Sequence, residues 1–226
     1  MKKLYSGKTK DVYQIDENCN QLFFKDDVTG ENGQFDPGAN SVGLTIEGAG
    51  FYGLAMSEYF FKLFIANGIK THFISADLAK RTMNVLPVSP FGTGIEVICR
   101  YVATGSFIRR YGGYIQDGTK LDGFVEVSLK DDARGDPFIS EELLMLFDIL
   151  EPGDYAYIQS ETRKIAQIIR EELAKKGIEL YDLKLEFGRT RKGDIVLIDE
   201  ISGGNMRAYR EGQSLGPIEL SKVFYN

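Results

Sequence analysis

The stretch YDLKLEFGRTRKGDIVLIDE, residues Tyr181–Glu200, decides the fold prediction. Asp182, Lys184 and Glu186 alternate with apolar residues, and the side chains of an extended chain point to opposite faces in turn. A polar, turn-like segment follows, and DIVLID then returns as a strongly apolar strand. We therefore predict a β-hairpin with one charged face. That face is either a solvated surface or, if the hairpin lies inside a sheet, a set of charges that needs partners such as a metal ion or a phosphate.

The composition is that of a folded globular chain with one large domain or two packed lobes. Of its 226 residues, 43% are hydrophobic and 27% are charged. The net charge of −6 argues against a protein that coats nucleic acid, although it leaves room for a local basic pocket that binds a small anion. Cys19 and Cys99 form no disulfide framework, and no apolar run is long enough for a signal peptide or a bilayer span. We expect a soluble cytoplasmic protein without nucleic-acid or membrane partners.

Strand and helix patterns alternate along the chain and predict a mixed α+β fold. In the first part we expect short strands at DVYQI, QLFFKDD, THFISAD and MNVLPV, a glycine-rich segment over residues 30–53 in which GENGQFDPGANSVG is a loop, and a helix over Leu54–Asn67. Later we expect a strand at GIEVICRYVA and a long helix from about Asp154 to Lys176, which Gly177 ends. Prolines and glycines near residue 87 separate a small strand-rich lobe, residues 1–86, from a larger α+β lobe, residues 87–226.

Two further stretches combine small residues with cationic ones. In LYSGKTKDVYQI, Gly7 lies between two strands and is followed by Lys8 and Lys10. A glycine lets the backbone approach a phosphate and lysines neutralise it, although both residues are also common in exposed hairpins. In CRYVATGSFIRR, Arg100 in a strand precedes a small-residue turn that contains Ser106. An arginine beside a hydroxyl suits a phosphate or a carboxylate.

A charged loop and a lone histidine complete the set of candidates. KDDARGDPFISEE places Lys130 and Asp136 in a loop before a helix, and this loop is alternatively a solvated turn with Ser140 as the helix N-cap. His72 is the only histidine, so we expect it to be structural and expect no catalytic triad. Neither cysteine has the spacing of a zinc ligand.

Seven blocks together resemble one family: LYSGKTKDVY, FKDDVT, GIKTHFI, CRYVATGSFIRR, KDDARGDP, LYDLKLEFG and DEISGGNMR occur in the order and spacing typical of SAICAR synthetases. The resemblance covers nearly the full chain except about residues 30–53. It implies a two-lobed α+β fold similar to that of protein kinases, with ATP held between the lobes. It also implies a homodimeric, ATP-dependent amide ligase of purine biosynthesis, which joins aspartate to the carboxylate of carboxyaminoimidazole ribotide and releases ADP and phosphate.

The resemblance implies a role for each candidate residue. The nucleotide contacts are Gly7, Lys8 and Lys10 at the phosphates and the backbone of Val85 and Leu86 at the adenine. The carboxylates that hold magnesium are Glu186 and Asp199. The contacts to the ribotide 5′-phosphate are Arg100, Ser106 and Arg207. The residues that face the reacting groups are Asp182 and Lys184, and those that border the substrate cleft are Lys130 and Asp136.

Some positions depart from the family pattern and leave other functions open. The family usually has an acidic residue where this chain has Gly204, and it commonly continues beyond IELSKVFYN with an arginine-bearing segment. The adenine, phosphate and magnesium residues are unaffected by these departures. The alternatives are a diverged family ligase that acts on another carboxylate or amine, and a kinase-like nucleotide-binding protein.

Overall fold

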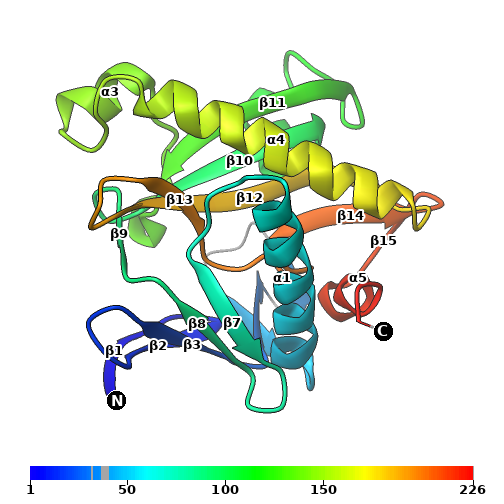
Figure 1. Ribbon diagram of the computed structural model, residues 1–226. Helices are drawn as coiled ribbons and strands as arrows, with labels where there is room; N and C mark the ends of the chain where they lie inside the picture. The colour runs from blue at the N-terminus through cyan, green and yellow to red at the C-terminus, as the bar shows by residue number, and fades with distance from the viewer. Residues whose placement is uncertain (32, 37–40, 226) are drawn as a thin grey trace. The chain divides into compact units, whose positions relative to one another are not determined.

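The chain divides into two compact units in the computed structural model, which describes residues 1–31, 33–36 and 41–225 (Figure 1). Unit 1 comprises Met1–Ser89, Gly188–Asn205 and Gly216–Asn226, and unit 2 comprises Pro90–Phe187 and Met206–Leu215. The sequence placed residues 1–86 in one lobe and 87–226 in the other. The units differ from these lobes because two later segments join the N-terminal part of the chain, which chain order alone does not reveal.

Unit 1 contains a five-stranded antiparallel sheet in the order β1-β2-β3-β8-β7. Its strands are β1 (Lys2–Ser6), β2 (Lys10–Gln14), β3 (Asn20–Phe24), β7 (Phe73–Asp77) and β8 (Thr82–Val85). The predicted strands DVYQI, QLFFKDD, THFISAD and MNVLPV overlap these elements. The strand pattern in this part of the sequence is therefore confirmed.

The segment GENGQFDPGANSVG is not the continuous loop that the sequence predicted. Strands β4 (Asp27–Glu31), β5 (Gln34–Phe35) and β6 (Val42–Thr45) form a small antiparallel sheet, and residues 32 and 37–40 lie outside the described residues. Helix α1 (Ala49–Ala66) also begins five residues before the predicted Leu54. A Cβ at Gly43 would lie 2.5 Å from the Gly30 carbonyl carbon, and one at Gly50 would lie 2.6 Å from the Phe24 oxygen. These glycines allow close backbone packing, so their number does not indicate a loop.

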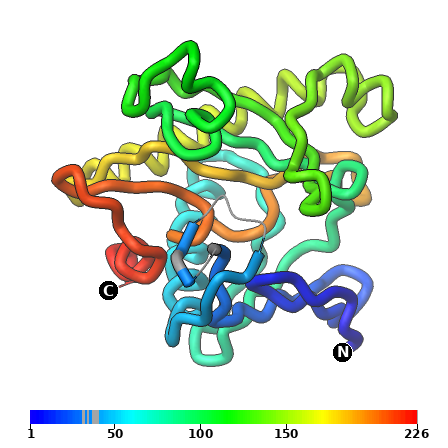
Figure 2. The backbone as a smooth tube through the Cα atoms, turned by 180° about the vertical axis from the view of Figure 1, so that it is seen from behind, coloured from blue at the N-terminus to red at the C-terminus, as the bar shows by residue number. Residues whose placement is uncertain are grey.

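The C-terminal helix α5 (Pro217–Lys222) packs beside α1 within unit 1, as Figures 1 and 2 both show. The ring of Tyr59 in α1 lies 5.0 Å from that of Phe224, between centroids. Asp26 accepts a hydrogen bond from the Gly50 N–H at 2.9 Å and so satisfies one of the free N–H groups at the start of α1. The packing of α5 and Phe224 on α1 attaches the end of the chain to the N-terminal part of unit 1.

Unit 2 is built on a mainly antiparallel sheet in the order β11-β10-β12-β14-β15. The strands are β10 (Ile95–Val102), β11 (Lys120–Leu129), β12 (Glu179–Thr190), β14 (Met206–Arg210) and β15 (Gln213–Ser214). Two shorter strands also pair with β12 but belong wholly or mostly to unit 1: β13 (Ile195–Ile198) and β9 (Val88–Pro90). The β12–β13 pair is the predicted hairpin, and its turn is closed by the Thr190 N–H donating to the Asp194 oxygen at 2.9 Å.

The helices of unit 2 are α2 (Ser106–Tyr111), α3 (Glu141–Leu146) and α4 (Asp154–Ala174), with the short 3-10 turn η1 (Asp132–Arg134). The predicted long helix is α4, and Gly177 follows it with a left-handed φ of 69°. It lies across one face of the sheet (Figure 1) and covers the odd-numbered residues of β10, such as the buried Val97. The even-numbered residues of β10 are therefore on the other, polar face. None of the helices in the described part of the chain is long and apolar enough to cross a bilayer.

His72 is buried in unit 1, in agreement with its expected structural role. Its ring lies 5.5 Å from that of Phe61, between centroids, and its Nε2 lies 3.1 Å from the backbone oxygen of Asp199. In the neutral ring Nε2 must carry the proton and donate it to this oxygen. Burial lowers the pKa of His72 to about 4 because desolvation outweighs the attraction of the Asp199 carboxylate.

Acid should therefore destabilise unit 1 through His72. Its pKa of about 4 in the folded chain lies below its ordinary 6.5, so the contribution of the neutral ring is complete above pH 6.5 and is lost as the pH falls toward 4. The full loss corresponds to about 3 kcal/mol. Urea unfolding between pH 7 and pH 4 measures it, with His72→Gln as the control, because the amide donates a similar hydrogen bond and does not titrate. Equal pH slopes for the two proteins would contradict this account.

Candidate functional site

The residues predicted from the sequence fall into two groups, one in each unit. The group in unit 1 comprises the predicted nucleotide contacts and one predicted metal ligand: Gly7, Lys8, Lys10, Val85, Leu86 and Asp199. The group in unit 2 comprises the predicted substrate contacts, the catalytic residues and the other metal ligand: Arg100, Ser106, Lys130, Asp136, Asp182, Lys184, Glu186 and Arg207. Each unit therefore collects residues with related predicted roles.

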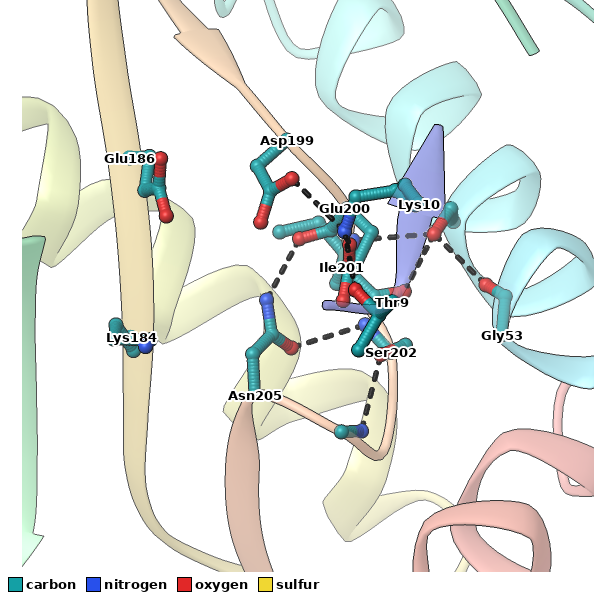
Figure 3. Close-up of polar contacts among 12 residues, drawn as sticks. Thr9, Lys10, Gly53, Lys184, Glu186, Asp199, Glu200, Ile201, Ser202 and Asn205 are labelled. Atoms are coloured by element: carbon teal, nitrogen blue, oxygen red, sulfur yellow. Dashed lines mark hydrogen bonds and ion pairs between the residues drawn. The ribbon is translucent and has the colours of Figure 1, made fainter. Parts of the chain in front are cut away.

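Lys10 is the centre of the group in unit 1. It begins β2, and its side chain is only 11% exposed. Its Nζ lies 2.9 Å from Asp199 Oδ1 and also pairs with the Glu200 carboxylate (Figure 3). Asp199 follows β13 with a left-handed φ of 69°, a strained conformation for this residue type that occurs often at functional sites. One buried lysine thus holds two consecutive carboxylates, and Glu200 was not among the predicted residues.

The segment after these carboxylates is fixed by side-chain hydrogen bonds. Asn205 accepts from the Ser202 N–H at 3.0 Å and donates to the Glu200 oxygen at 2.7 Å (Figure 3). A Cβ at Gly203 would lie 2.3 Å from the Pro217 oxygen, so a larger residue does not fit there. The Gly204 N–H donates to Ser202 Oγ at 3.0 Å. Packing against α5 explains Gly203, while Gly204 keeps the loop closed through its backbone.

The other predicted nucleotide contacts lie in the β1–β2 turn (Gly7 and Lys8) and at the end of β8 (Val85 and Leu86). The Gly7 N–H donates to the Lys10 oxygen at 2.7 Å, and its own oxygen accepts from Lys25 Nζ at 2.7 Å. Gly7 therefore closes the turn between β1 and β2. The Leu86 N–H donates to the His72 oxygen at 2.7 Å, so an adenine at this strand would use backbone groups other than that N–H. The nucleotide roles of Gly7, Lys8, Val85 and Leu86 stay predictions.

Arg100 is the centre of the group in unit 2. Its side chain is among the largest that are fully buried, and the residue is only 1% exposed. Its Nε donates to Glu126 at 2.6 Å, its Nη1 to Asp182 at 2.8 Å and its Nη2 to Ser106 Oγ at 3.1 Å. These partners come from β11, β12 and α2. The resemblance grouped Arg100 with Ser106 and Arg207 at a phosphate and gave Asp182 a separate place at the reacting groups, whereas Asp182 contacts Arg100 directly. The roles of these residues stay predictions.

Each carboxylate that holds Arg100 also holds a second arginine. Arg207 Nη1 donates to Asp182 at 2.9 Å, and Arg110 Nη2 donates to both oxygens of Glu126 at 2.8 Å. We call Arg100, Arg110, Arg207, Glu126 and Asp182 the arginine cluster. Three guanidinium groups share two carboxylates, so the cluster has a surplus positive charge. Such a surplus beside the Ser106 hydroxyl suits an anionic group, a phosphate above all.

Gly105 completes this arrangement because it gives Arg207 room. Its φ of 56° and ψ of −127° are accessible mainly to glycine. A Cβ at this position would lie 3.0 Å from Cζ and Nη2 of Arg207. The guanidinium therefore lies against the bare backbone of Gly105, and any side chain there would displace it.

Two lysine–glutamate pairs continue along the polar face of the same sheet. Lys184 Nζ donates to Glu96 Oε1 at 2.7 Å, and Lys130 Nζ donates to Glu186 Oε1 at 2.6 Å. Burial alone would lower the pKa of Lys184, but the carboxylate of Glu96, assisted by that of Glu186, raises it above the usual value. Lys184 is therefore an ammonium ion in a partly dehydrated place.

Asp136 has a structural contact that the sequence did not predict. It has a left-handed φ of 49°, its Oδ1 accepts from the Asp131 N–H at 2.8 Å, and its own N–H donates to the Asp131 oxygen at 3.1 Å. It thus closes the loop after β11. Ser140 caps α3 as expected, since its side chain accepts from the Leu143 N–H. Contact between a substrate and Lys130 or Asp136 stays a prediction.

The two predicted metal ligands belong to different units, Glu186 to unit 2 and Asp199 to unit 1. Both supply hard carboxylate oxygens and both pair with a lysine. Within residues 1–31, 33–36 and 41–225, no three His, Cys, Asp or Glu side chains are grouped in a way that could hold a metal. Each carboxylate by itself is the kind of hard oxygen ligand that magnesium takes, since this ion typically uses one or two carboxylates together with water and substrate phosphates. The metal roles of Glu186 and Asp199 stay predictions.

Comparison with known proteins decides the family. A profile of the SAICAR synthetase family matches residues 3–224. The chain belongs to the SAICAR synthetase family. A Clostridium tetani protein named phosphoribosylaminoimidazole-succinocarboxamide synthase is 54% identical over 99% of both chains, and a Finegoldia magna protein of the same name is 35% identical over 92% of this chain and 86% of its own.

Solved structures of the family have the same fold. A SAICAR synthetase in complex with ADP matches with a TM-score of 0.83 at 33% identity, over 94% of this chain and 87% of its own. An Ehrlichia chaffeensis phosphoribosylaminoimidazole-succinocarboxamide synthase matches with a TM-score of 0.84 at 31% identity, over 95% and 89%. The mixed α+β fold expected from the resemblance is confirmed at this level.

The structure adds functional candidates that the sequence did not single out: Glu96, Arg110, Glu126 and Glu200. A signal for Glu96 was present, because it stands four residues before Arg100 in one strand and therefore shares its face. Glu126 lies on a different strand, and its contact with Arg100 depends on the register of β10 against β11. Strand pairing of that kind cannot be read from one segment.

Anion binding by unit 2 should depend on the arginine cluster. Arg207→Ala removes a guanidinium, and Gly105→Ala places a methyl group 3.0 Å from that guanidinium, close enough to shift it. Both variants should therefore bind ribose 5-phosphate about 10-fold more weakly, or ~1.4 kcal/mol. Isothermal titration calorimetry measures this, with the exposed Arg109→Ala as the matched control. Unchanged affinity in both variants would show that the anion binds elsewhere.

Proposed function

We propose that this chain is an ATP-dependent amide ligase that joins L-aspartate to the carboxylate of carboxyaminoimidazole ribotide and releases ADP and phosphate. Its relatives support the reaction, because they carry the name of this synthase over nearly the full chain. The arginine cluster of this chain supports the proposal independently of the names of its relatives. Its surplus positive charge and the Ser106 hydroxyl provide a place for the ribotide phosphate.

The chemistry requires activation of a poor electrophile. In the proposed sequence of steps, a carboxylate oxygen attacks the γ-phosphorus of ATP and the bond from that phosphorus to the β,γ-bridging oxygen breaks. ADP departs as the leaving group, and the substrate carboxylate becomes an acyl phosphate. The amine of aspartate then attacks the carbonyl carbon, gives up a proton, and the carbon–oxygen bond to phosphate breaks. Such a reaction depends mainly on positioning and on charge neutralisation, so it needs no histidine or cysteine nucleophile.

Lys184 has the role of stabilising charge on the transferred phosphoryl group. Its ammonium has three N–H donors, of which Glu96 takes one. The remaining donors can meet phosphoryl oxygens without reorganisation, which is how fixed charges lower a barrier. Asp182 acts through the arginines that it holds, Arg100 and Arg207, and so orients the ribotide.

In this proposal unit 1 binds the nucleotide. Gly7, Lys8 and Lys10 contact its phosphates, and Val85 and Leu86 contact its base. Glu186 and Asp199 hold magnesium, which neutralises phosphate charge when it is bound. Lys130 and Asp136 border the substrate. A kinase-like arrangement with ATP between the lobes, a homodimer, a cytoplasmic location and the absence of nucleic-acid partners stay predictions from the sequence.

Coupling of ADP release to amide formation tests the proposal. Protein with ATP and magnesium should release ADP only when both carboxyaminoimidazole ribotide and aspartate are present, and mass spectrometry should find their amide. A panel of other carboxylates and amino acids is the comparison. Turnover on another pair alone would indicate a diverged ligase, and phosphorylation of a hydroxyl without an amide would refute a ligase of either kind.

Loss of either metal ligand should abolish turnover without unfolding the chain. Glu186→Gln and Asp199→Asn should each lower the rate of ADP release about 100-fold or more, because each removes a charged oxygen from magnesium. Glu179→Gln, an exposed change in the same strand as Glu186, is the control. Circular dichroism checks the fold. Near-normal release by either variant at saturating magnesium would remove that residue from the metal site.

A further inference from the structure

Glu96 is a buried carboxylate to which none of the preceding roles has been given. It lies in β10, the strand between β11 and β12, and is 6% exposed. Its Cα is opposite Ser128 on one side and Glu186 on the other, so all three residues share the polar face of the sheet. Glu96 therefore stands beside a predicted metal ligand, on the most enclosed strand of unit 2.

Glu96 forms a hydrogen bond and ion pair with Lys184. The two residues are diagonal neighbours, since Lys184 is opposite Ile98, and Lys184 Nζ donates to Glu96 Oε1 at 2.7 Å. The Lys184 side chain is 28% exposed and that of Glu96 is 9% exposed. The carboxylate is thus the fixed partner, while a lysine has a long flexible stem whose ammonium can reach several places.

Stability alone does not explain this pair. Removing two charges from water costs several kcal/mol, and well-packed apolar residues of similar volume often replace a buried ion pair without loss of stability. The neighbouring position Ile98 is apolar, so this face of the sheet tolerates such a residue. The presence of a charge pair next to Glu186 therefore indicates a role for the lysine.

The charges around Lys184 indicate what Glu96 prevents. Glu186, two residues along the same strand, attracts the ammonium, while Lys130, which pairs with Glu186, repels it. Without Glu96, the attraction of Glu186 would draw the ammonium along β12 and away from its present position. Glu186 already pairs with Lys130, so a second lysine there would add to the competition for the oxygens that the proposed function assigns to magnesium.

We propose that Glu96 is a positioning residue, which holds the Lys184 ammonium in place for the transferred phosphoryl group and keeps it from pairing with Glu186. The inference rests on the proposed function and deepens it. Glu96 itself need not touch a substrate. Its contribution passes through one hydrogen bond, so it should appear in the rate of the chemical step and should vanish when Lys184 is removed.

A double-mutant cycle tests this role. Glu96→Gln should lower kcat about 10- to 100-fold, the range typical when the partner of a site residue is lost, with KM for ATP and for the ribotide changed less than about 3-fold. Glu96→Asp, which keeps the charge, should recover part of the rate. Ser128→Ala is the matched control, because it changes a buried polar residue on the same face that has no contact with Lys184. It should stay within about 2-fold of the wild type.

The decisive comparison is Glu96→Gln in a Lys184→Met background, measured as single-turnover amide formation. We expect no further loss there, because the two residues act as one unit. Additive losses would overturn the positioning role and leave Glu96 a structural residue. An effect of Glu96→Gln on KM alone would do the same. So would a loss of rate in Glu96→Asp that its lower Tm explains. If the wild type forms no amide at all, the proposed function fails and this inference with it. If the wild type turns over normally but the losses caused by Glu96→Gln and Lys184→Met are additive, only the role of Glu96 is refuted.

Discussion

The buried guanidinium of Arg100 is the constraint on which the site in unit 2 depends. A cation that is 1% exposed must be surrounded by partners, because burying it alone would cost several kcal/mol. Its partners come from neighbouring strands and from α2, and they fix the register of β10 against β11 and β12. A slip of one residue would turn Arg100 toward the apolar face beneath α4. The arrangement that we propose to bind an anion is therefore also the arrangement that keeps the sheet in register.

Unit 1 uses the same physical device with a lysine. Lys10 is nearly buried and holds Asp199 and Glu200, while the loop that follows them is closed by Asn205 and by the packing of Gly203 against α5. Charges in both units are thus oriented by the folded chain before a ligand arrives. For a reaction whose main requirement is the neutralisation and alignment of phosphate groups, such preorganisation is the principal contribution that a protein can make.

Much of this arrangement could be predicted from the sequence, and the exceptions have physical causes. Period-2 alternation located the β12–β13 hairpin and its charged face, and Gly177 marked the end of α4, because these signals are local. The loop expected at GENGQFDPGANSVG was wrong because a glycine such as Gly43 serves close backbone packing against Gly30, which depends on the pairing of β4 with β6. Glu126 and Glu200 were missed for a related reason. Their importance comes from the cation that each one meets, and those contacts are set by strand pairing and by the folding of later segments onto the first part of the chain. Family resemblance supplied the roles of Glu186 and Asp199, and these stay predictions.

The central claim is that the carboxylate of the substrate is activated by direct transfer of the γ-phosphoryl group of ATP. The fate of the carboxylate oxygen tests it most directly. Carboxyaminoimidazole ribotide labelled with ¹⁸O in its carboxylate is converted with ATP and aspartate, and the released inorganic phosphate is analysed by mass spectrometry. The account predicts one ¹⁸O atom in each phosphate released in the first turnover from fully labelled substrate, because the oxygen that attacks phosphorus stays bonded to it. Phosphate without ¹⁸O, formed together with the amide, would contradict the account.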